Sequence, residues 1–165
     1  MSPERNIDWN SLESELGCEF PDDYKNLMNS HGGFEFSGMI LVNSPEGVLS
    51  RIRELRDHFL GLGFPRISVD RKNSFPGAIP QGLDSVSIDS LIEWADTDSD
   101  MSMCWYVGDN PNNWKVVVTD YRDCYFFPWG IGKMLGFLVD ARQSLPYREY
   151  FGWPDIEYRI EGFED

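Results

Sequence analysis

Residues 91–107, LIEWADTDSDMSMCWYV, decide the fold, because apolar runs at both ends flank the polar run 96–100. The apolar runs are rich in the aromatic and branched residues that strands favour, and the polar run supplies a loop. This pattern predicts an antiparallel β-hairpin. Two further runs of β-branched and aromatic residues, 114–119 and 124–127, follow after polar turns. We therefore expect a meander of antiparallel strands.

Helical periodicity dominates the residues that precede the hairpin. Trp9, Leu12 and Leu16 recur at i, i+3 and i+7 between a capping Asp8 and a terminating Gly17. Similar apolar spacing with start and stop signals recurs later in the chain. The expected helices are 9–16, 20–31, 44–60 and 131–142.

This order of elements, with helices first, then strands and then a helix, is typical of an α+β fold. We expect a single domain over residues 1–165, in which N-terminal helices and the late helix cover an antiparallel sheet. The core of this domain spans about 8–142. The Gly-, Pro- and Ser-rich segment 61–77 is expected to be an irregular excursion, and 143–165 a tail that contains a short alternating, strand-like stretch.

Composition excludes several classes of partner. The chain of 165 residues carries 14 Lys and Arg against 28 Asp and Glu, which gives a net charge of −14. Phosphate backbones and anionic membranes would repel such a protein, so we expect neither nucleic acid nor membrane as a direct partner. A signal peptide and a long apolar run are not seen, which predicts a cytoplasmic protein. Three cysteines without CxxC spacing favour reduced thiols.

No motif in the sequence predicts catalysis, a cofactor or a metal. His31 lies on the apolar face of its helix, and His58 on an Arg-rich helix, where each is more simply a structural or solvent-side residue. The acids of 96–100 resemble the start of a calcium loop, but Met101 and Val107 replace its glycine and its final glutamate. The Gly-rich run 130–136 fits no phosphate-binding pattern. An enzyme on an unrecognised template stays open as an alternative.

The charge is unevenly distributed along the chain. Residues 73–114 contain seven acids and no Lys or Arg, whereas residues 51–72 are rich in Arg. Such an acidic window is either an ordinary solvated face or a surface that recognises a basic protein. Aromatic residues between the acids would anchor a partner. The candidate partner-binding residues are Glu93, Asp96, Asp98, Asp100, Tyr106, Asp109 and Trp114.

Two blocks of the sequence resemble the SUKH superfamily. The run 16–33, LGCEFPDDYKNLMNSHGG, is similar to the N-terminal signature in which a helix opens near a proline and ends in Gly-Gly. The segments 91–100 and 104–118 resemble the strand-loop-strand block of many bacterial members. The resemblance covers roughly residues 8–142 and implies an α+β fold.

The resemblance also implies a function in protein binding. Most bacterial members are immunity proteins that neutralise a cognate toxin, and many such toxins are basic nucleases. Other members are a fungal cell-wall-synthesis regulator and the Syd protein, and no catalytic residue is inherited from any of them. We therefore expect a non-enzymatic immunity protein, a monomer or weak homodimer, that binds a basic toxin. A regulatory or scaffold protein with another cellular partner is the alternative.

Overall fold

Four helices and nine strands form within residues 5–36, 40–60, 66–97, 100–140 and 160–161, which are the residues that the computed structural model describes. The helices are α1 (Trp9–Leu16), α2 (Asp22–His31), α3 (Pro45–Leu60) and α4 (Ile131–Asp140), with short 3-10 turns η1 (Ile88–Ser90) and η2 (Pro111–Asn113). The strands are β1 (Phe34–Phe36), β2 (Ile40–Val42), β3 (Arg66–Val69), β4 (Ser85–Ser87), β5 (Leu91–Thr97), β6 (Ser102–Tyr106), β7 (Lys115–Thr119), β8 (Asp123–Phe127) and β9 (Ile160–Glu161).

The helix ends follow the capping signals of the sequence. The Asp8 carboxylate accepts a hydrogen bond from the Ser11 amide, and Gly17 ends α1 with a left-handed φ of 85°. The Ser44 hydroxyl accepts the Gly47 amide and so caps α3. These contacts confirm the predicted first and third helices.

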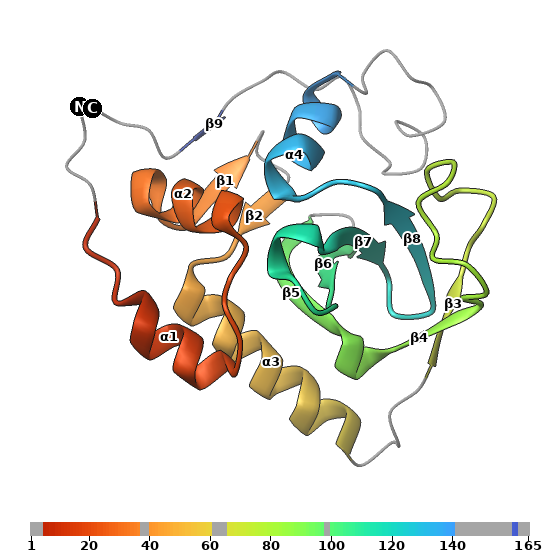
Figure 1. Ribbon diagram of the computed structural model, residues 1–165, viewed down its shortest axis with the longest axis horizontal. Coiled ribbons are helices and arrows are strands. Elements are labelled where there is room, and N and C mark those ends of the chain that lie inside the picture. The colour runs from red at the N-terminus through yellow and green to blue at the C-terminus, as the bar shows by residue number, and fades with distance from the viewer. Residues whose placement is uncertain (1–4, 37–39, 61–65, 98–99, 141–159, 162–165) are drawn as a thin grey trace.

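One sheet contains all nine strands, in the order β4-β3-β8-β7-β6-β5-β2-β1-β9. Every neighbouring pair is antiparallel except β3 and β8, which run parallel. The strands β5 to β8 form the predicted meander. Figure 1 shows that the sheet curls, so that β3 and β4 turn back beside β8 while α1, α2 and α3 lie on one side. The α+β prediction, with helices over an antiparallel sheet, is confirmed.

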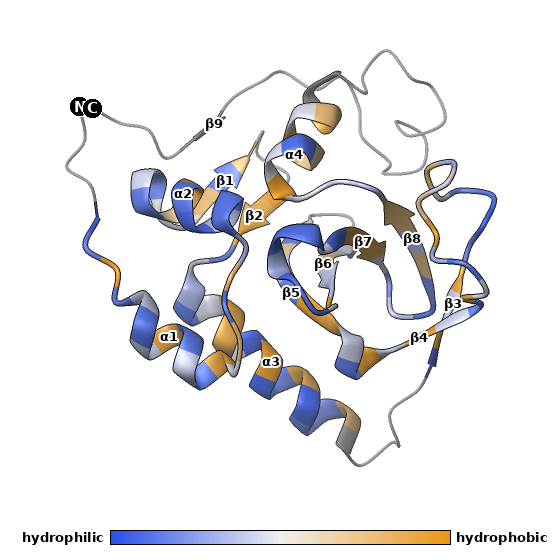
Figure 2. Ribbon diagram, in the orientation of Figure 1, coloured by the Kyte–Doolittle hydropathy of each residue, from blue (hydrophilic) through white to orange (hydrophobic). Residues whose placement is uncertain are grey.

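Two hydrophobic cores lie on the two faces of the sheet. The first core packs α1, α2 and α4 against the sheet and contains the fully buried Trp94 and Trp105. The second core fills the inside of the curl, between β3 to β8 and the segment 70–84. Figure 2 shows the consequence: β7 and β8 are largely hydrophobic, whereas α3 alternates hydrophobic and hydrophilic residues.

The structure differs from the sequence prediction at the short strands. Residues 66–69, inside the expected excursion 61–77, form β3, and Ile67 from this strand is fully buried in the second core. The strands β1 and β4 were not predicted, since three residues are too few for a reliable period. In the expected tail, residues 160–161 pair with β1 as strand β9, and the rest of that tail lies outside the described residues.

Candidate functional site: the acidic end of the sheet

The meander places the sequence-predicted acids at two opposite ends of the sheet. Consecutive hairpin connections alternate between the ends, so the β5–β6 loop and the β7–β8 turn share one end and the β6–β7 loop lies at the other. A five-residue strand separates these ends by about 17 Å. Asp96 and Asp100 therefore lie apart from Asp109. We call the first end, with Asp96, Asp100, Asp120 and Asp123, the acidic end.

The hairpin that carries Asp100 is closed by hydrogen bonds from Thr97. The Thr97 hydroxyl accepts the Met101 amide at 3.1 Å and donates to the Met101 carbonyl at 2.9 Å. Asp100 takes a left-handed φ of 59°, a conformation that Asp tolerates better than most residues. Its side chain is exposed, and the neighbouring Asp98 lies outside the described residues.

The β7–β8 turn is held by Asp120. Its carboxylate accepts the amides of Arg122 and Asp123, each at 2.9 Å. Partial burial opposes ionisation of Asp120, but these hydrogen bonds and the Arg122 charge outweigh it, so the pKa of Asp120 lies below its usual value. The turn thus presents an ionised Asp120 next to the exposed Asp123, with Arg122 as one opposing charge.

A buried glutamate underlies this end. The side chain of Glu93 is fully buried, accepts a hydrogen bond from Arg51 Nε at 2.9 Å and accepts another from the Tyr121 hydroxyl. Burial raises the pKa of Glu93 to about 7, and the nearby Asp96 adds to this increase, while Tyr121 and Arg51 act against it. Because Arg51 comes from α3, Glu93 from β5 and Tyr121 from the turn, the network fixes the acidic end to α3.

A row of three side chains crosses the open part of the sheet beside the acidic end. Strand pairing places Glu35 opposite Leu41 and Leu41 opposite Asp96, so all three project from the same face. Leu41 is 52% exposed and is the exposed large hydrophobic side chain of the described residues. Neighbouring strands lie about 4.8 Å apart, so this acid–leucine–acid row is compact.

Three of the sequence-predicted residues are positioned differently from the acids just described. Glu93 is buried, as is Trp114, whose indole N–H donates to the Gly108 carbonyl at 2.8 Å. Tyr106 is half-buried and its ring packs 5.3 Å from that of Phe126. These residues stabilise the fold, whereas Asp96 is half-buried and Asp100 and Asp109 are exposed.

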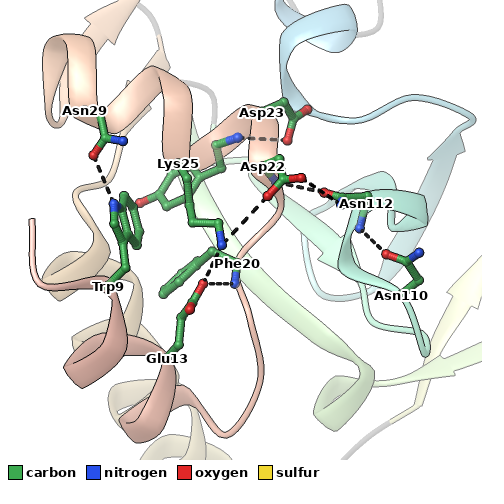
Figure 3. Close-up of polar contacts among 10 residues, drawn as sticks. Trp9, Glu13, Phe20, Asp22, Asp23, Lys25, Asn29, Asn110 and Asn112 are labelled. Carbon is green, nitrogen blue, oxygen red and sulfur yellow. Dashed lines mark hydrogen bonds and ion pairs between the residues drawn. The ribbon is translucent and has the colours of Figure 1, made fainter.

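Hydrogen bonds to α2 fix the loop at the opposite end. Figure 3 shows Asn112 facing Asp22: the Asp22 amide donates to Asn112 Oδ1 at 2.8 Å, and Asn112 Nδ2 donates back to the Asp22 carboxylate at 3.0 Å. Glu13 joins α1 to the same region, because its carboxylate accepts a hydrogen bond from the Phe20 amide and forms an ion pair with Lys25. The loop that carries Asp109 is therefore held by contacts within the protein.

Sequence reasoning missed Glu35, Leu41, Asp120 and Asp123 as members of this site. Glu35 and Leu41 each lie in a three-residue strand, and only the pairing of β1, β2 and β5 brings them beside Asp96. The alternation of Phe34, Glu35 and Phe36 is the one local signal that indicates an exposed acid on a strand.

The described residues offer little for catalysis or metal binding. Within them, no three His, Cys, Asp or Glu side chains gather closely enough to hold a metal ion. Burial raises the pKa of the Cys124 thiol to about 12 and that of Cys104 well above its usual value, which keeps both protonated. His58 is exposed on α3. A search of the same residues for a helix long and apolar enough to cross a membrane also finds none.

Comparison with known families gives a match that covers most of the chain. The SUKH_6 family model, described as SMI1-KNR4 cell-wall, matches residues 6–127. This range begins just before α1 and ends with β8. It therefore includes the helices α1 to α3 and the strands that carry the acidic end. No curated protein matches the chain significantly.

Proposed function

This chain belongs to the SUKH family described as SMI1-KNR4 cell-wall, as its sequence resemblance predicted, and from that premise we propose that it is an immunity protein that binds a basic toxin. The family is generally non-enzymatic and consistent with immunity-type function. In this proposal the protein acts in the cytoplasm and neutralises the toxin by covering its basic, substrate-binding face.

One observation carries the proposal: the fold gathers carboxylates from separate segments at the acidic end. Asp96 and Asp100 come from the β5–β6 hairpin, and Asp120 and Asp123 from the β7–β8 turn. Hydrogen bonds join Thr97 to Met101 at the base of the hairpin and Arg122 to Asp120 in the β7–β8 turn, so the described residues beside these charges are positioned before a partner arrives. Preorganised charges avoid part of the entropy cost of ordering an interface.

Leu41 is proposed to supply the binding affinity that the charges alone do not provide. Complementary charge mainly speeds association, from about 10⁵–10⁶ M⁻¹s⁻¹ toward 10⁸–10⁹ M⁻¹s⁻¹ at low salt, and suppresses wrong partners. Affinity comes mainly from buried anchors surrounded by polar groups. We propose that Leu41 is such an anchor, with Glu35 and Asp96 as its polar rim. Asp98 belongs to the same proposed contact by its place between Asp96 and Asp100.

The test is co-expression with the product of the neighbouring gene, the expected toxin, scoring both growth rescue and co-purification. We expect the wild type to rescue growth and to co-purify with the toxin. The variant Asp96→Asn/Asp100→Asn should rescue less well. The double variant Glu19→Gln/Asp109→Asn, which changes the net charge equally outside the acidic end, should rescue as the wild type does.

A regulatory or scaffold protein is the second candidate, since the matching family model is described as SMI1-KNR4 cell-wall. It predicts no rescue from any neighbouring toxin and a stable complex with a different cellular protein. Rescue without co-purification would count against direct neutralisation, and equal loss in both double variants would place the contact elsewhere.

A further inference from the structure

A groove lies at the end of the sheet opposite the acidic end. It has a volume of about 650 Å³ and runs between the last turn of α1, one face of α3 and the segment from η1 into β5. Val107, which follows β6, also lines it. Its volume falls in the range of about 300–1,000 Å³ that is usual for pockets with a bound ligand.

Apolar side chains form the floor of this groove. Leu49, Ile52 and Leu55 come from α3, and Ile92 comes from β5. Leu49 and Ile92 are buried, while Ile52 and Leu55 are half-buried, so part of the apolar surface faces the cavity rather than the core. Contiguous apolar surface in a concave site marks a binding site more often than isolated exposed residues do.

Two of the four charges at the rim of the groove pair with each other. Glu15, Arg53, Arg56 and Asp89 line the groove, two of each sign, in a protein with a net charge of −14. Arg53 makes an ion pair with Glu15. Within the described part of the chain, Arg56 has no ion-pair partner. One turn of α3 therefore presents an unpaired guanidinium above an apolar floor, and Asp89 lies on the facing wall.

We propose that this groove binds a short apolar segment of a partner protein that carries an acidic side chain for Arg56. The floor accepts the apolar side chains, and the Arg56 guanidinium forms a charge-assisted, bidentate hydrogen bond with the carboxylate. A basic residue elsewhere in the segment would form an ion pair with Asp89. Most of the protein surface repels acidic peptides, whereas the balanced rim of the groove does not.

This surface is independent of the proposed toxin contact. The groove takes its residues from the start of β5 and the end of β6, whereas the acidic end takes the opposite ends of the same strands. One partner could bind at each end at the same time. The proposal therefore stands or fails without reference to the toxin.

The test uses a library of random 12-residue peptides displayed on phage, selected on the full-length wild-type protein with Arg56→Glu as the counter-selection. Arg56 is exposed, so this variant is expected to fold. Enriched peptides should share apolar residues and an Asp or Glu. Methyl NMR of the complex should show shifts at Ile52, Leu55 and Val107, and none at Leu41.

Arg56→Glu should weaken the selected peptides by about tenfold or more, the size of a lost hydrogen bond between charged groups. Lys72→Glu, the matched change at an exposed cation outside the groove, should leave their affinity unchanged. The proposal is overturned if no peptide is enriched over the counter-selection, if the methyl shifts lie outside the groove, or if both charge reversals have the same effect.

Discussion

The two ends of the sheet differ in what they offer a partner, although the same strands build both. The acidic end is a set of carboxylates beside one exposed leucine, and its polar centre is a buried glutamate. The groove end is concave, apolar and balanced in charge. A meander separates its connections into two sets, so it can carry two unlike surfaces on one small domain. The acidic end offers a partner complementary charge, and the groove end offers it a complementary shape.

The largest expected effect comes from Arg51, which ties α3 to the acidic end. Arg51→Ala leaves the Glu93 carboxylate buried without its cation, and we expect a loss of about 3 kcal/mol in the free energy of unfolding at pH 8. Urea denaturation followed by tryptophan fluorescence measures it. The control is Arg53→Ala, two residues away, whose ion pair with Glu15 is largely exposed. An exposed pair contributes less than about 1 kcal/mol. Equal losses would contradict the buried network.

The second prediction concerns pH. The pKa of Glu93 rises on folding to about 7, so between its unfolded value and pH 7 the folded state holds a proton that the unfolded state has released. Stability from this group is therefore highest at low pH and falls as the pH rises toward 7, by at most about 3 kcal/mol.

Glu93→Gln removes this titration. Between pH 5 and pH 8 the wild type should therefore lose unfolding free energy relative to the variant. Thermal unfolding at four or five pH values gives the comparison. A difference that does not change with pH would show that Glu93 is ionised throughout.

The third prediction separates the two ends by their leucines. Leu41→Ala should weaken the toxin complex by about tenfold, because an interface anchor contributes more than about 1 kcal/mol. Its effect on stability should stay within about 0.5 kcal/mol, since the side chain is exposed. Leu55→Ala, in the groove, should leave toxin affinity unchanged. Isothermal titration of both variants tests this, and a loss at Leu55 as large as that at Leu41 would refute the separation.

The smallest expected effect lies in the loop at the groove end. Asn112→Ala removes both reciprocal hydrogen bonds to Asp22, and we expect a loss of about 1 kcal/mol. Amide hydrogen exchange should become faster in residues 108–113 and stay unchanged in 97–101. Faster exchange at both ends would mean that the two ends are not mechanically separate.

The sequence predicted the fold where a periodic pattern is long enough to read. Eight to sixteen residues per helix and the seven-residue β5 are such patterns, and the helices and the hairpin are confirmed. The three-residue strands β1 and β4 depend on pairing with distant strands, which local propensity cannot show. β3 was missed because its four residues lie inside a Gly- and Pro-rich segment.

The candidate site is less predictable from the sequence than the fold, because its members also depend on contacts between distant segments. Charge density indicated Asp96 and Asp100, but it could not distinguish an exposed acid from a buried one. The register shifts between Glu93 and Ala95, and both Trp94 and Ala95 then pack in the first core while Glu93 faces Arg51. Such a bulge has no signature in the sequence. The partnership of Leu41 with Glu35 and Asp96 likewise exists only across strands.

The most direct test of the account is the association rate of the toxin with the two double variants, measured by stopped flow from low to high salt. At low salt, Asp96→Asn/Asp100→Asn should slow association several-fold, while Glu19→Gln/Asp109→Asn should slow it little. The difference should vanish near 1 M salt, where the screening length is about 3 Å. Equal slowing by both variants, or none by either, would contradict the claim that the acidic end guides the toxin.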